Sequence, residues 1–127
     1  MTVLWIAVGG ALGSLARYYL SEALALAFGA AFPWGTVLVN ISGSFLIGFV
    51  AGGAGAHGRW IESEFARQFL MVGLCGGYTT FSAFSLQTVA MLQAGDVARA
   101  SLNVAASVAL CLLATFLGFA GAAALTR

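Results

Sequence analysis

The stretch GGYTTFSAFS, residues 76–85, decides the fold, because it interrupts an uncharged run that reaches from residue 68 to residue 95. That run is long enough to cross a bilayer, for which a helix needs about 20 apolar residues. The stretch nevertheless holds two glycines, five hydroxyl residues and two phenylalanines three positions apart. It favours a transmembrane helix broken near residues 76–80, since irregular backbone at membrane depth is tolerated only inside protein or against a cavity. The alternative is an ordinary glycine kink in a continuous helix.

The rest of the chain is just as apolar. Of its 127 residues, 61% are hydrophobic and only 7% are charged, whereas a soluble domain carries about a quarter charged residues. The formal net charge of +1 and the lack of a basic cluster provide no surface for nucleic acid. The composition therefore argues against a soluble enzyme and predicts an integral membrane protein.

The few charged residues divide the sequence into apolar blocks, which predict an all-α membrane protein with a single domain over residues 1–127. Four transmembrane helices are expected at about 3–27, 35–56, 62–93 and 97–124. The links between them are short. Pro33 suits the start of a helix, and Asp96 is well placed as an N-cap.

Small or polar residues recur every four positions on two predicted helices, and residues at this spacing share one helix face. The row on the second helix is Thr36, Asn40, Ser44, Gly48 and Gly52. The row on the fourth helix is Asn103, Ser107, Cys111 and Thr115. Two interpretations stay open: close helix packing through small residues, or a polar pathway, because polar groups inside membranes are often functional. Packing accounts less well for the two asparagines, since a buried amide needs several partners.

Charges are scarce within the predicted spans. The acids Glu22, Glu62, Glu64 and Asp96 lie late in the first helix or near helix ends, whereas a proton-coupled exporter normally needs a buried carboxylate. Arg17 is the one charge well inside a segment. It either reaches toward the membrane interface or forms a vestibule that attracts anions.

The arginines give little topological bias. With the N-terminus inside, Arg59, Arg67 and Arg127 lie on the cytoplasmic side, against Arg99 and Arg17 outside. So small an imbalance does not fix the orientation and is expected of a chain that inserts both ways. Four helices also make a thin bundle for a pathway that excludes water, so self-association is expected.

Three motifs together resemble the Fluc (CrcB) family of bacterial fluoride channels: GALGSLARY at 10–18, WGTVLVNISGSFLIG at 34–48 and GGYTTFSAFS at 76–85. The resemblance covers nearly the whole chain. It implies a passive fluoride-selective channel, not an enzyme, that exports cytoplasmic fluoride down its electrochemical gradient and confers fluoride resistance. It further implies an antiparallel, dual-topology homodimer with two pores in the bacterial inner membrane. The alternative is a small dual-topology exporter of the multidrug type, for which the buried acid is missing.

The resemblance also implies roles for individual residues. Arg17 is the vestibule arginine, and the backbone carbonyls of Gly76 and Thr79 from both subunits hold a structural sodium ion at the dimer centre. The fluoride pathway is assigned to Asn40, Phe81, Phe84, Asn103, Ser107 and Thr115. The sequence departs from the family pattern in four places: Tyr78, often apolar; Ala83, often threonine; Asn103, tyrosine in some members; and Cys111, serine in some members.

The chemistry of these residues suits fluoride, which is small, strongly hydrated and costly to dehydrate. Asn40 can supply amide protons, and Thr80 and Ser82 can supply hydroxyl protons. Phenylalanine rings have positive edges that can face an anion, and a fixed cation adds a positive field in a medium of low dielectric constant. Valine at Gly77 is expected to disturb the break, because a β-branched residue tolerates positive φ poorly.

Overall fold

The computed structural model describes residues 1–54, 61 and 63–125. Its elements are α1 (Thr2–Phe28), α2 (Trp34–Ala54), α3 (Glu64–Arg67), the π-helix η1 (Gln68–Cys75), α4 (Gly76–Tyr78), α5 (Phe81–Gln93) and α6 (Val97–Ala124). Within these residues, four helical stretches are long and apolar enough to cross a bilayer: α1, α2, the stretch 64–93 that contains α3 to α5, and α6. The chain is therefore an all-helical, multi-pass membrane protein.

Side-chain caps set two of the helix starts. Ser63 has an extended backbone and accepts a hydrogen bond from the Ala66 N–H, so the third span begins at residue 64 and not at the predicted 62. Asp96 is the N-cap of α6, as predicted, and accepts from the Arg99 N–H at 3.1 Å. The predicted end of the second helix at residues 55–56, and Arg59, Glu62 and Arg127, lie outside the described residues.

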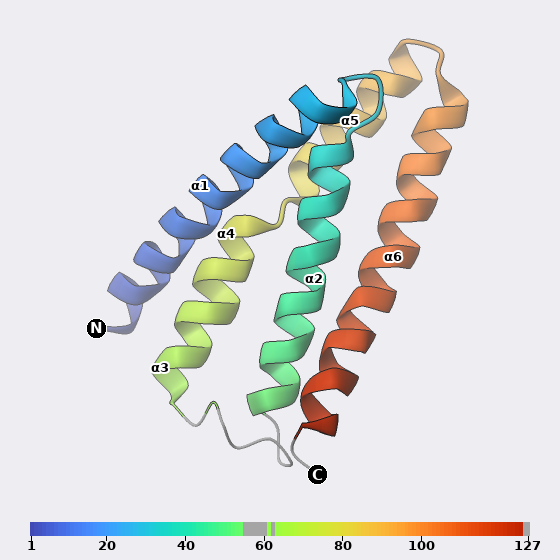
Figure 1. Ribbon diagram of the computed structural model, residues 1–127. Coiled ribbons are helices and arrows are strands. Elements are labelled where there is room, and N and C mark those ends of the chain that lie inside the picture. Colours follow the sequence, from blue (N-terminus) through green and yellow to red (C-terminus); the bar gives the residue numbers. More distant parts are fainter. Residues whose placement is uncertain (55–60, 62, 126–127) are drawn as a thin grey trace.

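Glycines fasten the helices in two pairs, in which α1 runs along η1 and α4 while α2 runs along α6 (Figure 1). A Cβ atom on Gly13 would lie 2.7 Å from the Tyr78 nitrogen, and one on Gly48 would lie 2.9 Å from the Thr115 carbonyl carbon. Both separations are shorter than a side chain tolerates. Gly48 and Gly52, at the C-terminal end of the row on α2, therefore form a packing face, as small residues in membrane helices commonly do.

The expectation that Gly77 needs a positive φ is wrong. Among the described residues, the glycines with positive φ are Gly29 and Gly95, at 80° and 79°, and Gly77 lies within α4. Its side chain is excluded for a different reason, because a Cβ there would lie 2.9 Å from the Gly10 Cα.

The third span is not helical throughout. α4 ends at Tyr78, and Thr79 and Thr80 adopt extended backbone conformations, with ψ angles of 158° and 112°, before α5 begins at Phe81. Figure 1 shows the short non-helical segment that joins α4 to α5. This segment lies between the two helix pairs, next to α2.

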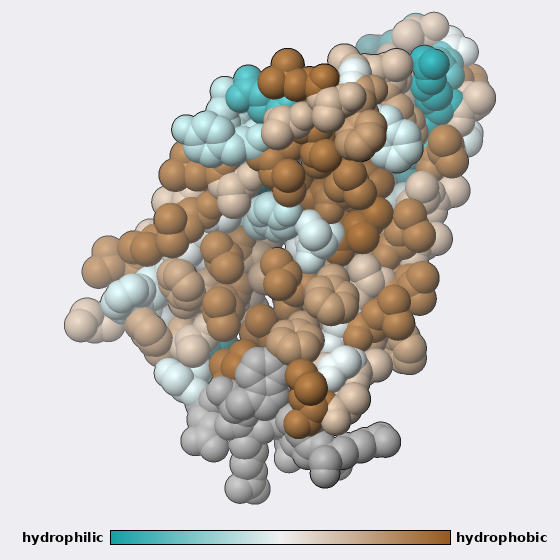
Figure 2. Space-filling view, viewed as in Figure 1, coloured by the Kyte–Doolittle hydropathy of each residue, from teal (hydrophilic) through white to brown (hydrophobic). Residues whose placement is uncertain are grey.

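The surface suits lipid. Figure 2 shows hydrophobic residues over most of the visible face, with hydrophilic residues gathered toward its upper end. Large apolar side chains are exposed along every long helix, among them Leu26, Leu46, Leu86 and Leu112. A chain that covers itself with apolar side chains in this way is stable where the surroundings are also apolar.

Candidate functional site

Two side chains of α1 bind carbonyl groups at the end of α4 and in the extended segment. The Ser14 hydroxyl donates to the Gly77 carbonyl oxygen over 3.4 Å, and Arg17 Nη1 donates to the Thr79 carbonyl oxygen over 3.2 Å. Both donors share one face of α1, since they are three residues apart. Arg17, half-buried, therefore points toward the extended segment.

Asn40 of α2 makes two hydrogen bonds with the main chain of Thr80, one to its carbonyl group and one to its N–H group. Its Nδ2 donates to the Thr80 carbonyl oxygen over 3.0 Å, and its Oδ1 accepts from the Thr80 N–H over 2.7 Å. In a continuous α-helix this N–H would donate to the carbonyl of Gly76. Asn40 thus stabilises the extended conformation and takes from Gly76 its normal helical donor. An amide NH2 group has two protons, so one Nδ2 proton is left for another acceptor.

A cavity of about 400 Å³, here called the central cavity, opens beside the extended residues. Its wall combines residues of α2, α4, α5 and α6 that are distant in the sequence. Seven of the predicted site residues lie in this wall: Asn40, Gly76, Thr79, Thr80, Phe81, Phe84 and Ser107. The wall also contains both cysteines, Cys75 and Cys111.

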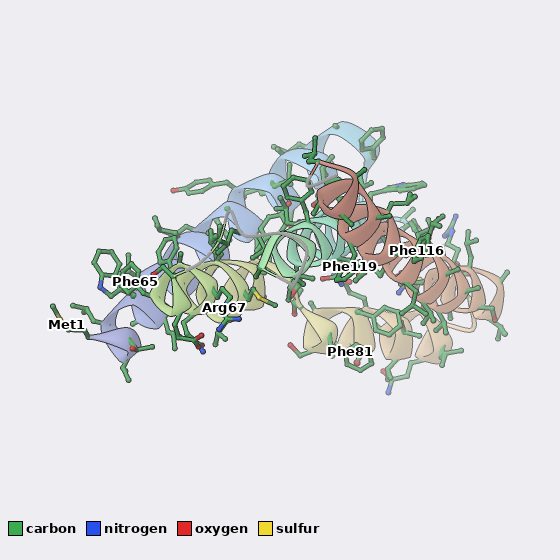
Figure 3. All side chains as sticks on the ribbon, turned by 90° about the horizontal axis from the view of Figure 1, so that it is seen from below. Met1, Phe65, Arg67, Phe81, Phe116 and Phe119 are labelled. Carbon is green, nitrogen blue, oxygen red and sulfur yellow. The ribbon has the colours of Figure 1, made fainter. Side chains whose placement is uncertain are left out.

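The two phenylalanines of this wall differ sharply in exposure. Phe84 is 9% exposed and Phe81 is 77% exposed, although their ring centroids are only 5.2 Å apart. Figure 3 shows Phe81 at the edge of the molecule, on the side of α5 away from α1 and α2. Phe84 is thus packed within the chain, whereas the ring of Phe81 lies on the outer surface of the chain.

Arg17 and Ser82 lie on a second cavity of about 600 Å³, here called the Arg17 cavity. Its wall also holds Ser14, Glu22 and Thr80. Thr80 lines both cavities, so they lie next to each other at this residue. Its hydroxyl lies 3.2 Å from that of Ser82. The structure places the predicted arginine and the hydroxyl residues at this second cavity, next to the first.

Two predicted residues of α6 lie outside the wall of the central cavity. Asn103 is fully buried between α5 and α6, where its Nδ2 donates to Thr88 Oγ1 over 2.9 Å and its Oδ1 accepts from Ser107 Oγ over 3.4 Å. The Thr115 hydroxyl donates to the Cys111 carbonyl oxygen over 3.0 Å, within its own helix. Of the polar row of α6, only the two middle residues, Ser107 and Cys111, thus line the central cavity.

The predicted cation ligands fit unequally. The Gly76 carbonyl has lost its helical donor to Asn40, and Gly76 is exposed on the wall of the central cavity. Thr79 also lines this wall, but its carbonyl already accepts from Arg17, so a cation at that carbonyl would lie near a guanidinium charge. Oxygen atoms are the ligands that hard cations prefer, usually six or more, so one chain supplies only part of such a site.

Ser14 lines the Arg17 cavity and Ser42 contacts Tyr78 beside the site, and neither residue was predicted from the sequence. Ser42 Oγ lies 2.8 Å from the hydroxyl of Tyr78. Ser14 could have been found, because it lies three residues before Arg17 on the same helix face. Ser42 gives no such signal, since residues two apart, such as Asn40 and Ser42, do not share a helix face.

Known proteins are similar to this chain over nearly its full length. The family model described as "CrcB-like protein, Camphor Resistance (CrcB)" matches residues 4–119. A protein of Methylocella silvestris named fluoride-specific ion channel FluC is 52% identical over 127 residues, which is 100% of this chain and 97% of that protein. Proteins of the same name from Rhodospirillum rubrum and Gluconobacter oxydans are 53% and 54% identical, over 96% and 92% of this chain and 95% and 81% of theirs.

Proposed function

The chain belongs to the CrcB family, and on this premise we propose that it is a fluoride-specific ion channel. It catalyses no reaction. Two observations carry the proposal. Relatives of this name match the chain over nearly their full length, and a largely apolar cavity that Asn40, Thr80 and Ser107 also line lies beside an interrupted membrane span. A multidrug-type exporter is not favoured, because the residues that line the central cavity include no acid.

The central cavity is the proposed fluoride pathway. Removing water from a small anion is costly unless other donors replace it. Asn40 keeps one Nδ2 proton free for this purpose, and Ser107 supplies a hydroxyl from α6. The rings of Phe81 and Phe84 can turn their positive edges toward the anion. Asn103 and Thr115 act in this proposal by holding α6 in place, because their side chains bind within the helices.

The Arg17 cavity is the proposed vestibule. A cation at the end of a cleft raises the local concentration of anions, and Arg17 is held in position by its hydrogen bond to the Thr79 carbonyl. Thr80 and Ser82 carry hydroxyl groups at the boundary between the two cavities. Fluoride would pass from Arg17 to these hydroxyls and then into the central cavity.

A sodium ion held by the carbonyls of Gly76 and Thr79 is part of the same proposal. When bound, it supplies a fixed positive charge beside the anion pathway, where a low dielectric constant strengthens its effect. The loss of the helical donor of Gly76 supports this role. Two carbonyls from one chain and two from a second copy would provide four of the ligands.

We further propose that two copies assemble in antiparallel orientation in the bacterial inner membrane. The 77% exposure of Phe81 and the exposed Gly76 support a partner on this face. A tag at the C-terminus should then be accessible from both sides of the membrane in one population of cells. Access from one side alone would contradict dual topology.

The function is tested by fluoride efflux. Liposomes that contain the purified protein and are loaded with potassium fluoride should release fluoride on addition of valinomycin, as measured with a fluoride electrode. Liposomes loaded with chloride should release almost none. Absence of fluoride efflux, or equal efflux of both anions, would contradict the proposal.

A further inference from the structure

One polar contact at the end of α4 has no part in the proposed pathway. The Tyr78 hydroxyl lies 2.8 Å from Ser42 Oγ of α2. Ser42 Oγ also lies 2.8 Å from the Leu38 carbonyl oxygen and 3.1 Å from that of Val39. A serine hydroxyl has one proton, and these carbonyls can only accept. Ser42 therefore donates to its own helix, and Tyr78 donates to Ser42.

The ring of Tyr78 packs against a glycine of α2, the helix that also contains Ser42. A Cβ atom on Gly43 would lie 3.0 Å from Tyr78 Cδ1 and would collide with the methyl group of Thr79. Gly43 is buried. Tyr78 is thus held on α2 twice, by its ring against Gly43 and by its hydroxyl on Ser42.

This contact fixes a short element. α4 has three residues, and the extended Thr79 follows it directly. On one side of α4, Gly77 packs against Gly10 of α1. On the other side, Tyr78 binds Ser42 of α2. Gly76 and Thr79, which both line the central cavity, lie two residues before Tyr78 and one after it. A rotation of the Tyr78 residue would therefore turn both carbonyls.

We propose that Tyr78 is a positioning residue, whose hydrogen bond to Ser42 orients the Gly76 and Thr79 carbonyls for a hard monovalent cation. This inference rests on the proposed function for the cation, sodium, and for the two carbonyls that would hold it.

The test measures sodium binding through stability. A ligand that binds the folded state raises its melting temperature, so the melting temperature of the purified protein is measured over a sodium series, with N-methyl-D-glucamine keeping the ionic strength constant. The Tyr78→Phe and Ser42→Ala variants should each raise the half-saturating sodium concentration roughly 2- to 10-fold, as expected for one hydrogen bond. The double variant should be no worse than either single one, because both remove the same contact. Tyr19→Phe, which removes an exposed phenol of α1, should behave as the wild type.

The outcomes separate this inference from the channel function. An unchanged sodium response in Ser42→Ala and Tyr78→Phe would overturn the positioning role, and so would a wild-type protein that does not respond to sodium. If Tyr78→Phe does not fold, the sodium response of Ser42→Ala tests the positioning role alone, because that variant leaves the tyrosine ring in place. A sodium response that weakens as predicted in a protein without fluoride efflux would overturn the channel and leave the positioning role standing.

Discussion

The two halves of the third membrane span are built for different neighbours. Before the extended residues, η1 and α4 lie against α1 so closely that Gly73 and Gly77 have no room for a side chain. After them, α5 buries only Phe84 among its residues, while Phe81 and Leu86 are more than two-thirds exposed. The first half is packed against other helices of the chain, and the second presents its surface outward. An apolar sequence of one apparent span thus encodes two kinds of surface.

The difference follows from where the glycines lie. The first half contains Gly73, Gly76 and Gly77, whereas α5 contains none. Glycine lets two membrane helices approach to backbone contact, so the first half gains its packing from main-chain proximity. α5 carries bulky apolar side chains instead, and these need apolar surroundings.

The largest effect is expected from breaking the first half. Valine at Gly13 would place side-chain atoms against the Leu74 and Tyr78 main chain, and overpacking against rigid backbone should cost more than about 3 kcal/mol of folding free energy. We expect Gly13→Val to yield no monodisperse protein on gel filtration. Gly121→Val is the control, because a Cβ there meets nothing within 4 Å. Normal purification of Gly13→Val would mean that α1 does not lie against α4.

The next largest effect is expected at the junction of the two halves. Asn40→Asp keeps an acceptor for the Thr80 N–H but loses the donor to the Thr80 carbonyl, and its charge repels fluoride. Flux should fall on the order of 100-fold, about the cost of an unpaired charge facing an anion, while the protein still purifies. Gln93→Glu adds the same charge at an exposed position of α5 and should leave efflux unchanged. Wild-type efflux in Asn40→Asp would remove Asn40 from the pathway.

The phenylalanines of α5 sharpen the comparison at a single helix turn. Phe84→Ile should lower the free energy of unfolding by about 1–2 kcal/mol, since that ring is packed within the chain. Phe81→Ile should change it by less than about 0.5 kcal/mol, as for an exposed site. Both should lower fluoride efflux per folded protein steeply if ring edges face the anion, with Phe69→Met of η1 as the control. Normal efflux in both isoleucine variants would contradict the pathway assigned to them.

The smallest effect on transport is expected from the contact of α5 with α6. Asn103→Ala removes the hydrogen bonds to Thr88 and Ser107 and should cost about 1–2 kcal/mol of stability. Efflux per folded protein should stay within about twofold of the wild type, a difference of less than roughly 0.5 kcal/mol. A steep loss of efflux from a protein of normal stability would instead place Asn103 on the pathway.

Much of this architecture could be predicted from the sequence. The four apolar blocks predict the spans, because charges in lipid are costly, and Asp96 is recognisable as a cap. The predicted reason why valine is not tolerated at Gly77, a positive φ angle, was wrong. A sequence pattern does not distinguish a glycine that is required for its φ angle from one that is required by a neighbouring helix. The pairing of Asn40 with the Thr80 main chain was also missed, because it joins residues 40 positions apart. The difference between Phe81 and Phe84 depends on packing that no spacing rule describes.

The central claim is that fluoride passes through the central cavity, and the native cysteine Cys111 on its wall offers the most direct test. Cys111 is half-buried there, whereas Cys75 is 3% exposed. Fluoride efflux from liposomes is measured before and after treatment with methyl methanethiosulfonate, which adds a small S-methyl group. The account predicts that efflux of the wild type falls on the order of tenfold, since pore width governs conduction, and that Cys111→Ala keeps its efflux after the same treatment. Unaffected wild-type efflux, or equal loss in Cys111→Ala, would contradict the pathway.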